Sequence, residues 1–501
     1  MSIRIQVLKG TGWVAAGEGL GYIASFVRNM ILARLLSKAD FGLAAVFSMV
    51  LSLLEFTAKL GVGRFLIREP EGDRPEFVST GHALQALAAG TSAVLILALA
   101  PWLATLFGIR EHAWAIAVLA GVVLARGLQH LDTERFQRHL DFRRAALVEA
   151  VPQVLVTLAA WPVAIWLEDY RAVLVLLVLK ASMSLALSHL LAELPYRWVW
   201  HPEFGRRMLR FGWPLLLTGF LMFGIMQGDQ FLVASFYDMA QLAPYAAAAT
   251  LVMAPQFLYS RVFNAVALPL VSRVQEIPAV FIRRYRQVLA GMLLYTSAST
   301  AAFIVGCEAL MRIVYGAKYS GAGPIVVWLA AVAAYRGLRV SVAVANIAKG
   351  DSDSQLIANL WRATALVPAY FVARSGQPLW MIAACGILGE LLATIVCVWR
   401  LKNRAGVPMY LTLWPAAGIG LISCGAGLLA HWTATVPVWA GLMAALGAGG
   451  AAAGITVALV PELRSETRLV MRELHFRGPT GALIKWMGHG QGNGVSPAPD
   501  R

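Results

Sequence analysis

Long apolar runs alternate with short polar segments along most of the chain. A helix needs about 20 mostly apolar residues to cross a hydrocarbon core of about 30 Å, and fourteen runs reach this length. The pattern predicts an all-α polytopic membrane protein with about 14 transmembrane helices. The predicted spans are 11–34, 41–65, 80–107, 112–137, 145–166, 171–193, 211–236, 243–270, 286–314, 322–348, 354–373, 378–399, 409–430 and 434–460.

The connections between these spans fall into two alternating sets. One set carries clusters of cations, such as Arg197, Arg206, Arg207 and Arg210, whereas each connection of the other set carries at most one. Because cytoplasmic loops are enriched in Lys and Arg, the asymmetry predicts that both termini are cytoplasmic and that the number of spans is even.

Composition supports this interpretation. The 501 residues are 59% hydrophobic and 14% charged, whereas soluble domains are about 25% charged. The net charge of +15 would suggest nucleic acid in a soluble protein, but here it reflects the basic loops, so no nucleic-acid partner is expected. The four cysteines lie singly in apolar runs, so neither a disulfide framework nor a metal site is expected. A cleavable signal peptide is not expected either.

Weak internal similarity suggests a repeat. Gly12-Trp13 aligns with Gly212-Trp213, and Arg126-Gly127-Leu128 aligns with Arg336-Gly337-Leu338. An even number of helices separates the copies, which predicts two pseudo-symmetric six-helix bundles plus two C-terminal helices. The predicted regions are an N-lobe (1–200), a C-lobe (201–405), two additional transmembrane helices (406–460) and a cytoplasmic tail (461–501).

Several cations lie deep inside the predicted spans. An ionisable residue at the bilayer centre costs at least about 2.5–3.5 kcal/mol, so each is a candidate functional residue. An arginine donates two parallel hydrogen bonds to phosphate oxygens and stays charged at any working pH. The candidate residues for binding a diphosphate in a central cavity are Arg28, Lys59, Arg126, Arg261, Arg336 and Arg339.

Deep acids are fewer than deep cations. Each could bind a coupling Na⁺ or H⁺ or could neutralise a nearby cation, as Glu55 and Lys59 can at a spacing of four residues. Both alternatives stay open, and no other cofactor and no metal site is expected. The acids are Glu18, Glu55, Asp229, Glu308 and Glu390.

The first two spans resemble a known family. Residues 26–36 read FVRNMILARLL, and they are followed by Asp40-Phe41-Gly42-Leu43 and by the run LGVGRFLIR at 60–68. These motifs resemble the opening of Wzx-type polysaccharide flippases of the MOP (multidrug/oligosaccharidyl-lipid/polysaccharide) superfamily. The first motif also resembles the first helix of the lipid II flippase.

The resemblance implies a V-shaped pair of lobes, an undecaprenyl-diphosphate-linked oligosaccharide as cargo, and alternating access driven by an ion gradient or the membrane potential. It matches Arg28 to an arginine on which the lipid II flippase relies, and Arg34 to the second arginine of that motif. Asn29 stands where the lipid II flippase has an aspartate, which argues against a coupling role at this position.

Three other functions are considered. A multidrug or cation antiporter of the same superfamily would have a cavity dominated by acids. A membrane polymerase or ligase acting on the same glycan would need a catalytic acid or base outside, where the predicted connections are only a few residues long. We therefore expect no catalytic residues. A structural role in an export complex is the third, and a polysaccharide polymerase or export machinery is the expected protein partner.

Overall fold

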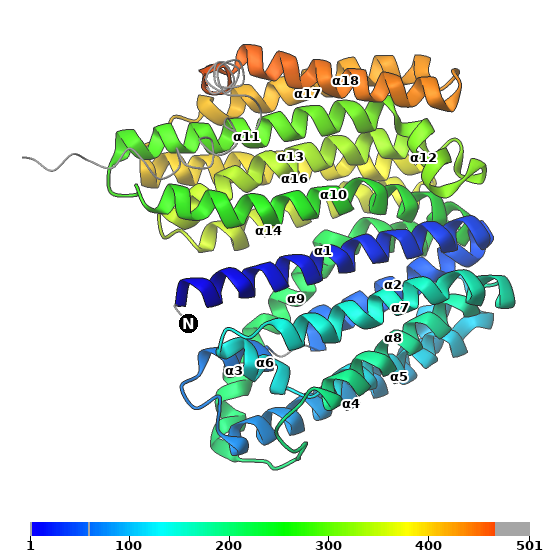
Figure 1. The fold of residues 1–501 in the computed structure, drawn as a ribbon. Helices are drawn as coiled ribbons and strands as arrows, with labels where there is room; N and C mark the ends of the chain where they lie inside the picture. The colour runs from blue at the N-terminus through cyan, green and yellow to red at the C-terminus, as the bar shows by residue number, and fades with distance from the viewer. Residues whose placement is uncertain (1–2, 59–60, 466–501) are drawn as a thin grey trace, which may run out of the picture. The chain divides into compact units, whose positions relative to one another are not determined.

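The computed structural model describes the backbone of residues 3–58 and 61–465, and the side chains of these residues except 3–11, 14–16, 18 and 55–58. Within these ranges all regular structure is helical. The elements are α1 (Ile3–Leu35), α2 (Lys38–Ala58), α3 (Val62–Arg68), α4 (Pro75–Leu106), η1 (Arg110–His112), α5 (Ala113–Gly127), α6 (Asp132–Arg138), α7 (Arg143–Leu167), α8 (Arg171–Leu190), α9 (Pro202–Phe236), α10 (Met239–Ser272), α11 (Pro278–Val305), α12 (Cys307–Tyr315), η2 (Ala317–Tyr319), α13 (Gly323–Ala348), α14 (Asp353–Ala363), α15 (Leu366–Arg374), α16 (Leu379–Ala405), α17 (Tyr410–Thr433) and α18 (Val438–Leu459) (Figure 1).

Many of these helices suit a membrane. In the described part of the chain, eleven helical segments are long and apolar enough to cross it, and a bent pair, 110–127 with 132–138, raises the number to as many as twelve. The first two predicted spans fall on α1 and α2, which have 33 and 21 residues. Each of the fourteen predicted spans lies on one helix or on consecutive helices. The prediction of an all-α polytopic membrane protein is confirmed.

The second predicted span, 41–65, is wrong in its C-terminal part. The described residues of α2 reach Ala58, and α3 begins at Val62. Gly61 has a φ of +65°, in the left-handed region, which an α-helix does not continue through. Lys59 lies outside the described residues.

The ninth predicted span, 286–314, is wrong at both ends. The helix starts earlier, at Pro278, and α11 ends at Val305. The chain then forms the separate nine-residue helix α12, which carries Glu308 outside the segments that could cross a membrane. The connection from α11 to α13 is therefore longer than the few residues expected.

The chain forms two compact units. Unit 1 comprises the described residues of Met1–Arg261, Cys307–Val332 and Gln355–Ala393, and unit 2 those of Val262–Gly306, Ala333–Ser354 and Thr394–Arg501. The helices α10, α13 and α16 contribute to both. The predicted lobes, with boundaries at residues 200 and 405, stay a prediction.

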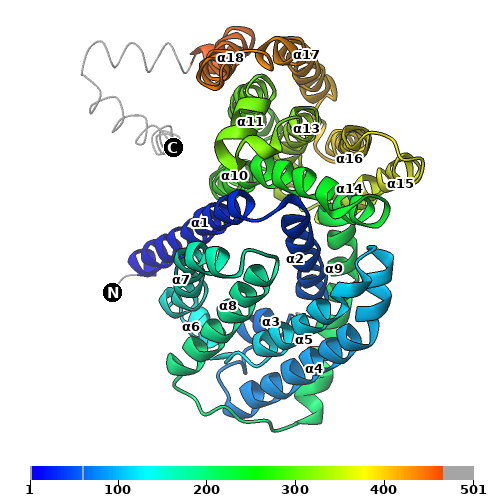
Figure 2. The same cartoon turned by 90° about the vertical axis from the view of Figure 1, so that its right-hand side faces the viewer.

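Close helix pairs build unit 1. α1 packs along α7, α4 along α5, α7 and α5 against α8, and α2 against α9 (Figure 2). A Cβ atom at Gly127 of α5 would lie 1.9 Å from Cβ of Ala89 on α4, so only glycine permits this approach. Small residues at such contacts are the usual means of packing membrane helices. The arrangement brings α1, α2, α8 and α9 close enough to share one pocket.

The segment 307–320 is fixed to the end of α1 by reciprocal hydrogen bonds. Arg34 donates from Nε to the carbonyl oxygen of Val314 at 3.0 Å and from Nη2 to that of Ile313. Lys318 donates from Nζ to the carbonyl oxygen of Arg34 at 3.2 Å and to that of Leu36. Each cation therefore satisfies carbonyl groups that a helix end leaves without an intrahelical partner.

In unit 2, α11 packs against α17 and α18. Tyr285 Oη and Thr412 Oγ1 share a hydrogen bond of 2.6 Å, and Thr456 Oγ1 donates to Ser297 Oγ at 2.8 Å. Hydroxyl pairs of this kind join membrane helices at modest gain in stability.

An ion pair closes the turn between α13 and α14 onto α16. Arg400 donates from Nε and Nη2 to the two carboxylate oxygens of Asp351 at 2.7 and 2.6 Å, and Arg404 Nε lies 3.6 Å from Oδ2. The Asp351 side chain is 1% exposed. The hydrogen bonds from Arg400 hold the pKa of Asp351 below its ordinary value.

Candidate functional site

A pocket of about 140 Å³ lies inside unit 1 and is lined by α1, α2, α8, α9 and α10. Helical spacing explains the faces: Gln227 and Gln230 of α9 are three residues apart, and Ala246 and Thr250 of α10 are four apart, so each pair shares one side of its helix. The lining residues are Arg28, Asn29, Leu32, Phe41, Ala44, Ala45, Ser48, Met49, Val173, Leu176, Leu177, Gln227, Gln230, Ala246 and Thr250.

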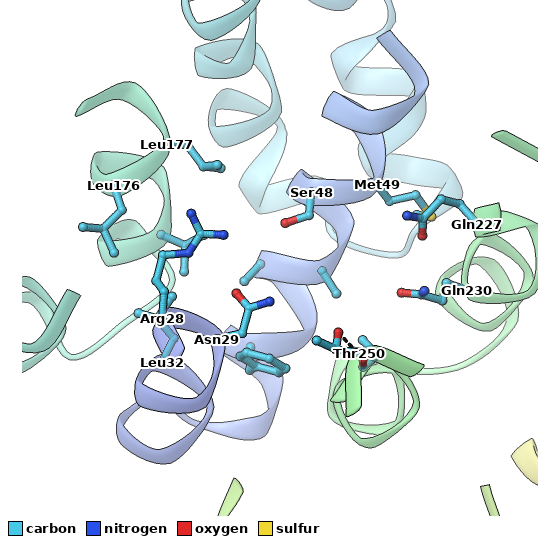
Figure 3. A pocket seen from close by; sticks show the side chains of 15 residues that line it. Arg28, Asn29, Leu32, Ser48, Met49, Leu176, Leu177, Gln227, Gln230 and Thr250 are labelled. Carbon is cyan, nitrogen blue, oxygen red and sulfur yellow. Dashed lines mark hydrogen bonds between the residues drawn. The ribbon is translucent and has the colours of Figure 1, made fainter. Parts of the chain in front are cut away.

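The polar side chains of the pocket come from four helices, α1, α2, α9 and, with Thr250, α10. Figure 3 shows Arg28 and Asn29 of α1 and Ser48 of α2 directed into the same space as Gln227 and Gln230 of α9. Of these residues, Arg28 is one of the cations that the sequence predicts to bind a diphosphate. The amides and the hydroxyl can donate or accept hydrogen bonds, so the pocket can bind a polar group of more than one kind.

The charge of the pocket restricts the class of ligand more than its neutral hydrogen-bonding groups do. Arg28 is the one charged residue among the fifteen described residues that line it. A positive pocket with neutral hydrogen-bonding neighbours attracts anions and repels organic cations. Whole drug-sized ligands use pockets of about 300–1,000 Å³, so this one suits a phosphate-sized group rather than an oligosaccharide.

The other predicted cations have different surroundings. Arg126, on α5, lies within electrostatic range of Arg28. Arg261, on α10, lies over the ring of Tyr22 of α1, 5.6 Å from its centroid. Arg336 and Arg339 lie on the part of α13 that belongs to unit 2, and Arg339 is 5% exposed.

Each described acid among the candidates has a partner in the protein. Asp229 of α9 accepts a hydrogen bond of 2.9 Å from Tyr245 Oη. Glu308 accepts from the Gly321 backbone N–H at 3.0 Å and pairs with Arg312 at 3.3 Å. The structure does not describe the side chains of two further candidate acids, Glu18 and Glu55. A coupling role for any of these four acids stays a prediction.

Glu390 pairs with a buried arginine. Its Oε1 lies 2.9 Å from Arg362 Nε, and the two side chains are 3% and 5% exposed. Arg362 Nη1 also donates to Asn359 Oδ1 at 3.2 Å. Of the two alternatives for this acid, the structure favours neutralisation of a cation.

Sequence reasoning did not single out several paired charges of the spans. Among them, Lys180 of α8 and Glu149 of α7 form an ion pair of 3.1 Å, and Arg362 is the partner of Glu390. The rule that singled out the other deep charges, an ionisable residue inside an apolar run, applies to all three and could have found them.

Comparisons with known proteins identify the family and the fold. The model of the family described as "Polysaccharide biosynthesis protein" matches residues 31–324. No curated protein matches the chain significantly. The family match confirms the resemblance that the sequence motifs indicated.

Solved structures with similar folds are transporters. The lipid II flippase MurJ, in an inward closed conformation, is similar with a TM-score of 0.71 at 14% identity, over 89% of this chain and 97% of that one. An inward-facing multidrug resistance MATE family transporter of the MOP superfamily has a TM-score of 0.59 at 15% identity, over 81% and 96%. The Vibrio cholerae MATE transporter VcmN has a TM-score of 0.54 at 13% identity, over 81% and 98%. At these identities the likeness shows the fold alone.

Proposed function

Because this chain belongs to the polysaccharide biosynthesis protein family, we propose that it is a flippase for undecaprenyl-diphosphate-linked oligosaccharide repeat units. It moves them from the cytoplasmic to the periplasmic leaflet of a bacterial inner membrane for exopolysaccharide, capsule or O-antigen synthesis. Both termini lie in the cytoplasm.

The observation that carries this proposal is the positive charge of the pocket. Its lining holds one arginine, neutral amides and a hydroxyl, and none of the described lining residues is a carboxylate. A diphosphate is the anionic part of the cargo, and arginine binds phosphate oxygens through two parallel hydrogen bonds. The multidrug antiporter alternative, which the MATE-like fold keeps open, calls for acids where this lining has Arg28.

In this proposal, different groups of the pocket bind different chemical parts of the cargo. Arg28 holds a phosphate, and Asn29, Gln227 and Gln230 offer hydrogen bonds to the remaining phosphate oxygens or to the first sugar. The prenyl chain stays in lipid, because transferring it into a polar pocket would lose its hydrophobic burial. The other predicted cations stay candidates for binding the head group in this proposal: Lys59, Arg126, Arg261, Arg336 and Arg339.

Movement requires that the bound state favour neither side strongly. A cargo bound equally well in two conformations shifts neither of them, and one held too tightly does not leave. A Na⁺ or H⁺ gradient or the membrane potential supplies the direction. Of the candidate coupling acids, Asp229 lies on a pocket-lining helix, α9, and its side chain is described.

The test reconstitutes the full-length protein in liposomes with a short-chain polyprenyl-diphosphate-linked saccharide. Flipping is measured as the fraction of the glycan that becomes accessible to an impermeant lectin. Arg28→Ala removes a charged hydrogen bond worth about 1.5–3 kcal/mol, so the rate at low substrate falls about 10- to 100-fold. Arg28→Lys keeps the charge but not the fork and gives an intermediate rate.

Two outcomes would contradict the proposal. One is flipping by the Arg28→Ala protein at the wild-type rate, with equal amounts inserted. The other is a wild-type protein that leaves the glycan in place but exports an organic cation, as the antiporter alternative requires.

A further inference from the structure

Three histidines of unit 1 meet at the break between α5 and α6. His82 comes from α4, His130 from the residues between α5 and α6, and His189 from the last turn of α8. The ring centroids of His82 and His130 are 4.5 Å apart, and those of His130 and His189 are 5.4 Å apart. His82 and His130 are 1% and 3% exposed. We name these three residues the histidine cluster; none of them lines the pocket.

Two rings of the histidine cluster accept hydrogen bonds from the backbone. The N–H of Leu131 donates to Nε2 of His82 at 3.1 Å, and the N–H of Asp132 donates to Nδ1 of His130 at 3.0 Å. Both N–H groups lie at the start of α6, where a helix leaves its first donors without an intrahelical partner. An imidazole nitrogen accepts a hydrogen bond only while it carries no proton. The arrangement therefore requires that both rings be neutral.

The third ring has the opposite role. His189 donates from Nε2 to the carbonyl oxygen of Leu128 at 3.0 Å. A second proton on this ring would leave that hydrogen bond intact, because the donating nitrogen already carries its proton in the neutral form. The requirement for a neutral ring thus falls on His82 and His130.

The other ionisable groups around the histidine cluster are paired or titrate in a different pH range. Asp132 is 0% exposed, pairs with Arg135 and accepts a hydrogen bond of 2.6 Å from the backbone N–H of Glu193. Glu193 in turn pairs with Arg135 and Arg144. The ring of Tyr196 lies 4.3–5.6 Å from the three imidazoles. Side chains of these types ordinarily titrate near pH 4 or above about pH 10, so between about pH 5.5 and 7.5 the histidines are the groups that change charge.

The start of α6 supports a larger part of unit 1. Leu131 belongs to an apolar core that also contains Phe65 of α3 and Met208 of α9. Arg138, in the last turn of α6, donates from Nη1 to the carbonyl oxygen of Ile67 in α3 at 3.2 Å. Since α9 extends from this core to the pocket, a change at the α5–α6 break reaches both α3 and a pocket-lining helix.

A proton on either accepting nitrogen removes its hydrogen bond and leaves a backbone N–H facing a cation. Two charged rings at this separation would also repel each other in a buried position. Proton binding therefore favours a state in which the rings reach water and the start of α6 is released.

We infer that the histidine cluster is a pH-sensitive latch. It holds the start of α6 against α4, and through α6 the helix α3, while His82 and His130 are neutral, and it opens when they bind protons. The latch requires no cargo, so it operates whether or not the protein is a flippase.

The experiment follows hydrogen exchange of the backbone amides of residues 128–138 by mass spectrometry. It uses the full-length protein in detergent between pH 7.5 and 5.5, with exchange times scaled for the intrinsic pH dependence of amide exchange. A histidine that gains a proton on opening, with an ordinary pKa of about 6.5, raises the opening equilibrium constant about tenfold over this range. We expect an increase of about 100-fold for the two rings together.

Two variants keep an acceptor that does not titrate. His82→Gln places a side-chain amide oxygen close to the position of Nε2, and His130→Asn places one close to that of Nδ1. Each single variant should reduce the increase to about tenfold, and the double variant should abolish it. The matched control is His431→Gln, which changes an exposed histidine in the last turn of α17 in unit 2 and should behave as the wild type.

Three outcomes would overturn the latch. In the first, residues 128–138 of the wild-type protein are as well protected at pH 5.5 as at pH 7.5, as buried histidines of a purely structural role would be. In the second, the double variant retains the wild-type increase. In the third, α11 in unit 2 loses protection to the same extent, which would mean that acid unfolds the whole protein rather than the start of α6.

Discussion

Arg28 and Arg362 both lie in helices of unit 1, and their surroundings are opposite. Arg362 is 5% exposed and pairs at 2.9 Å with Glu390, so a carboxylate of the protein neutralises its charge. Arg28 faces a pocket whose described lining holds only neutral groups besides itself. An arginine in a spanning helix thus belongs to the scaffold where a buried acid meets it, and becomes available to an anionic ligand where it borders a cavity.

The contrast between Arg28 and Arg362 predicts that the largest loss of stability comes from a substitution at Glu390, the partner of Arg362. Glu390→Gln leaves the Arg362 guanidinium buried beside a neutral amide, and breaking a buried ion pair from one side costs about 3–5 kcal/mol. We expect a clear fall in the unfolding temperature of the detergent-purified protein, followed by intrinsic tryptophan fluorescence.

The matched control removes both charges. Arg362→Met with Glu390→Leu fills a similar volume with apolar atoms, and such replacements are often neutral or stabilising. If Glu390→Gln instead keeps the wild-type unfolding temperature and loses dependence on Na⁺ or on pH in the flipping assay, Glu390 is a coupling acid and the contrast with Arg28 disappears.

Asp351 extends the comparison to a satisfied acid outside the spanning helices. Asp351→Asn weakens the charged hydrogen bonds that Asp351 accepts from Arg400, and it is expected to cost about 1.5–3 kcal/mol at neutral pH. The pKa of Asp351 is lowered in the folded protein by Arg400, so its contribution is complete above the unfolded value of about 3.9. It is lost as the pH falls from that value through the folded pKa.

The measurement compares the unfolding temperatures of the wild type and Asp351→Asn between neutral pH and pH 3. The gap should be constant above about pH 5 and should narrow below about pH 4, because protonation makes Asp351 resemble asparagine. A gap that widens with acid would mean that the carboxyl is stabilised in its protonated form.

The sequence predicted the helices better than it predicted their ends. The length of an apolar run identifies a span, but the break after α2 depends on Gly61. The left-handed backbone conformation of Gly61 cannot be predicted from hydropathy. The boundary after α11 was missed for a related reason. α12 is a short amphipathic helix, and its apolar residues extended the apparent span to include Glu308.

The candidate site was predictable where a single helix carries the signal. Arg28 follows from its depth in the first predicted span, and it lines the pocket. The choice between a ligand-facing and a paired charge is tertiary: Glu390 and Arg362 are 28 residues apart, and no spacing rule joins them. Gln227 and Gln230 were missed because a neutral amide in an apolar run does not stand out by charge.

The smallest expected change in stability belongs to Arg28, and it is the most informative. Arg28 forms no ion pair with another described residue, and Arg28→Gln relieves its repulsion with Arg126. We expect the free energy of unfolding to change by no more than about 0.5 kcal/mol, so that the unfolding temperature stays the same or rises slightly. The difference appears on adding farnesyl diphosphate. A ligand that binds the folded state stabilises it by RT ln(1 + [L]/Kd), so the wild-type protein gains several degrees at saturating ligand while Arg28→Gln gains little. A loss of stability comparable to that of Glu390→Gln, with the ligand effect retained, would place Arg28 among the scaffold arginines and would remove the distinction on which the pocket assignment rests.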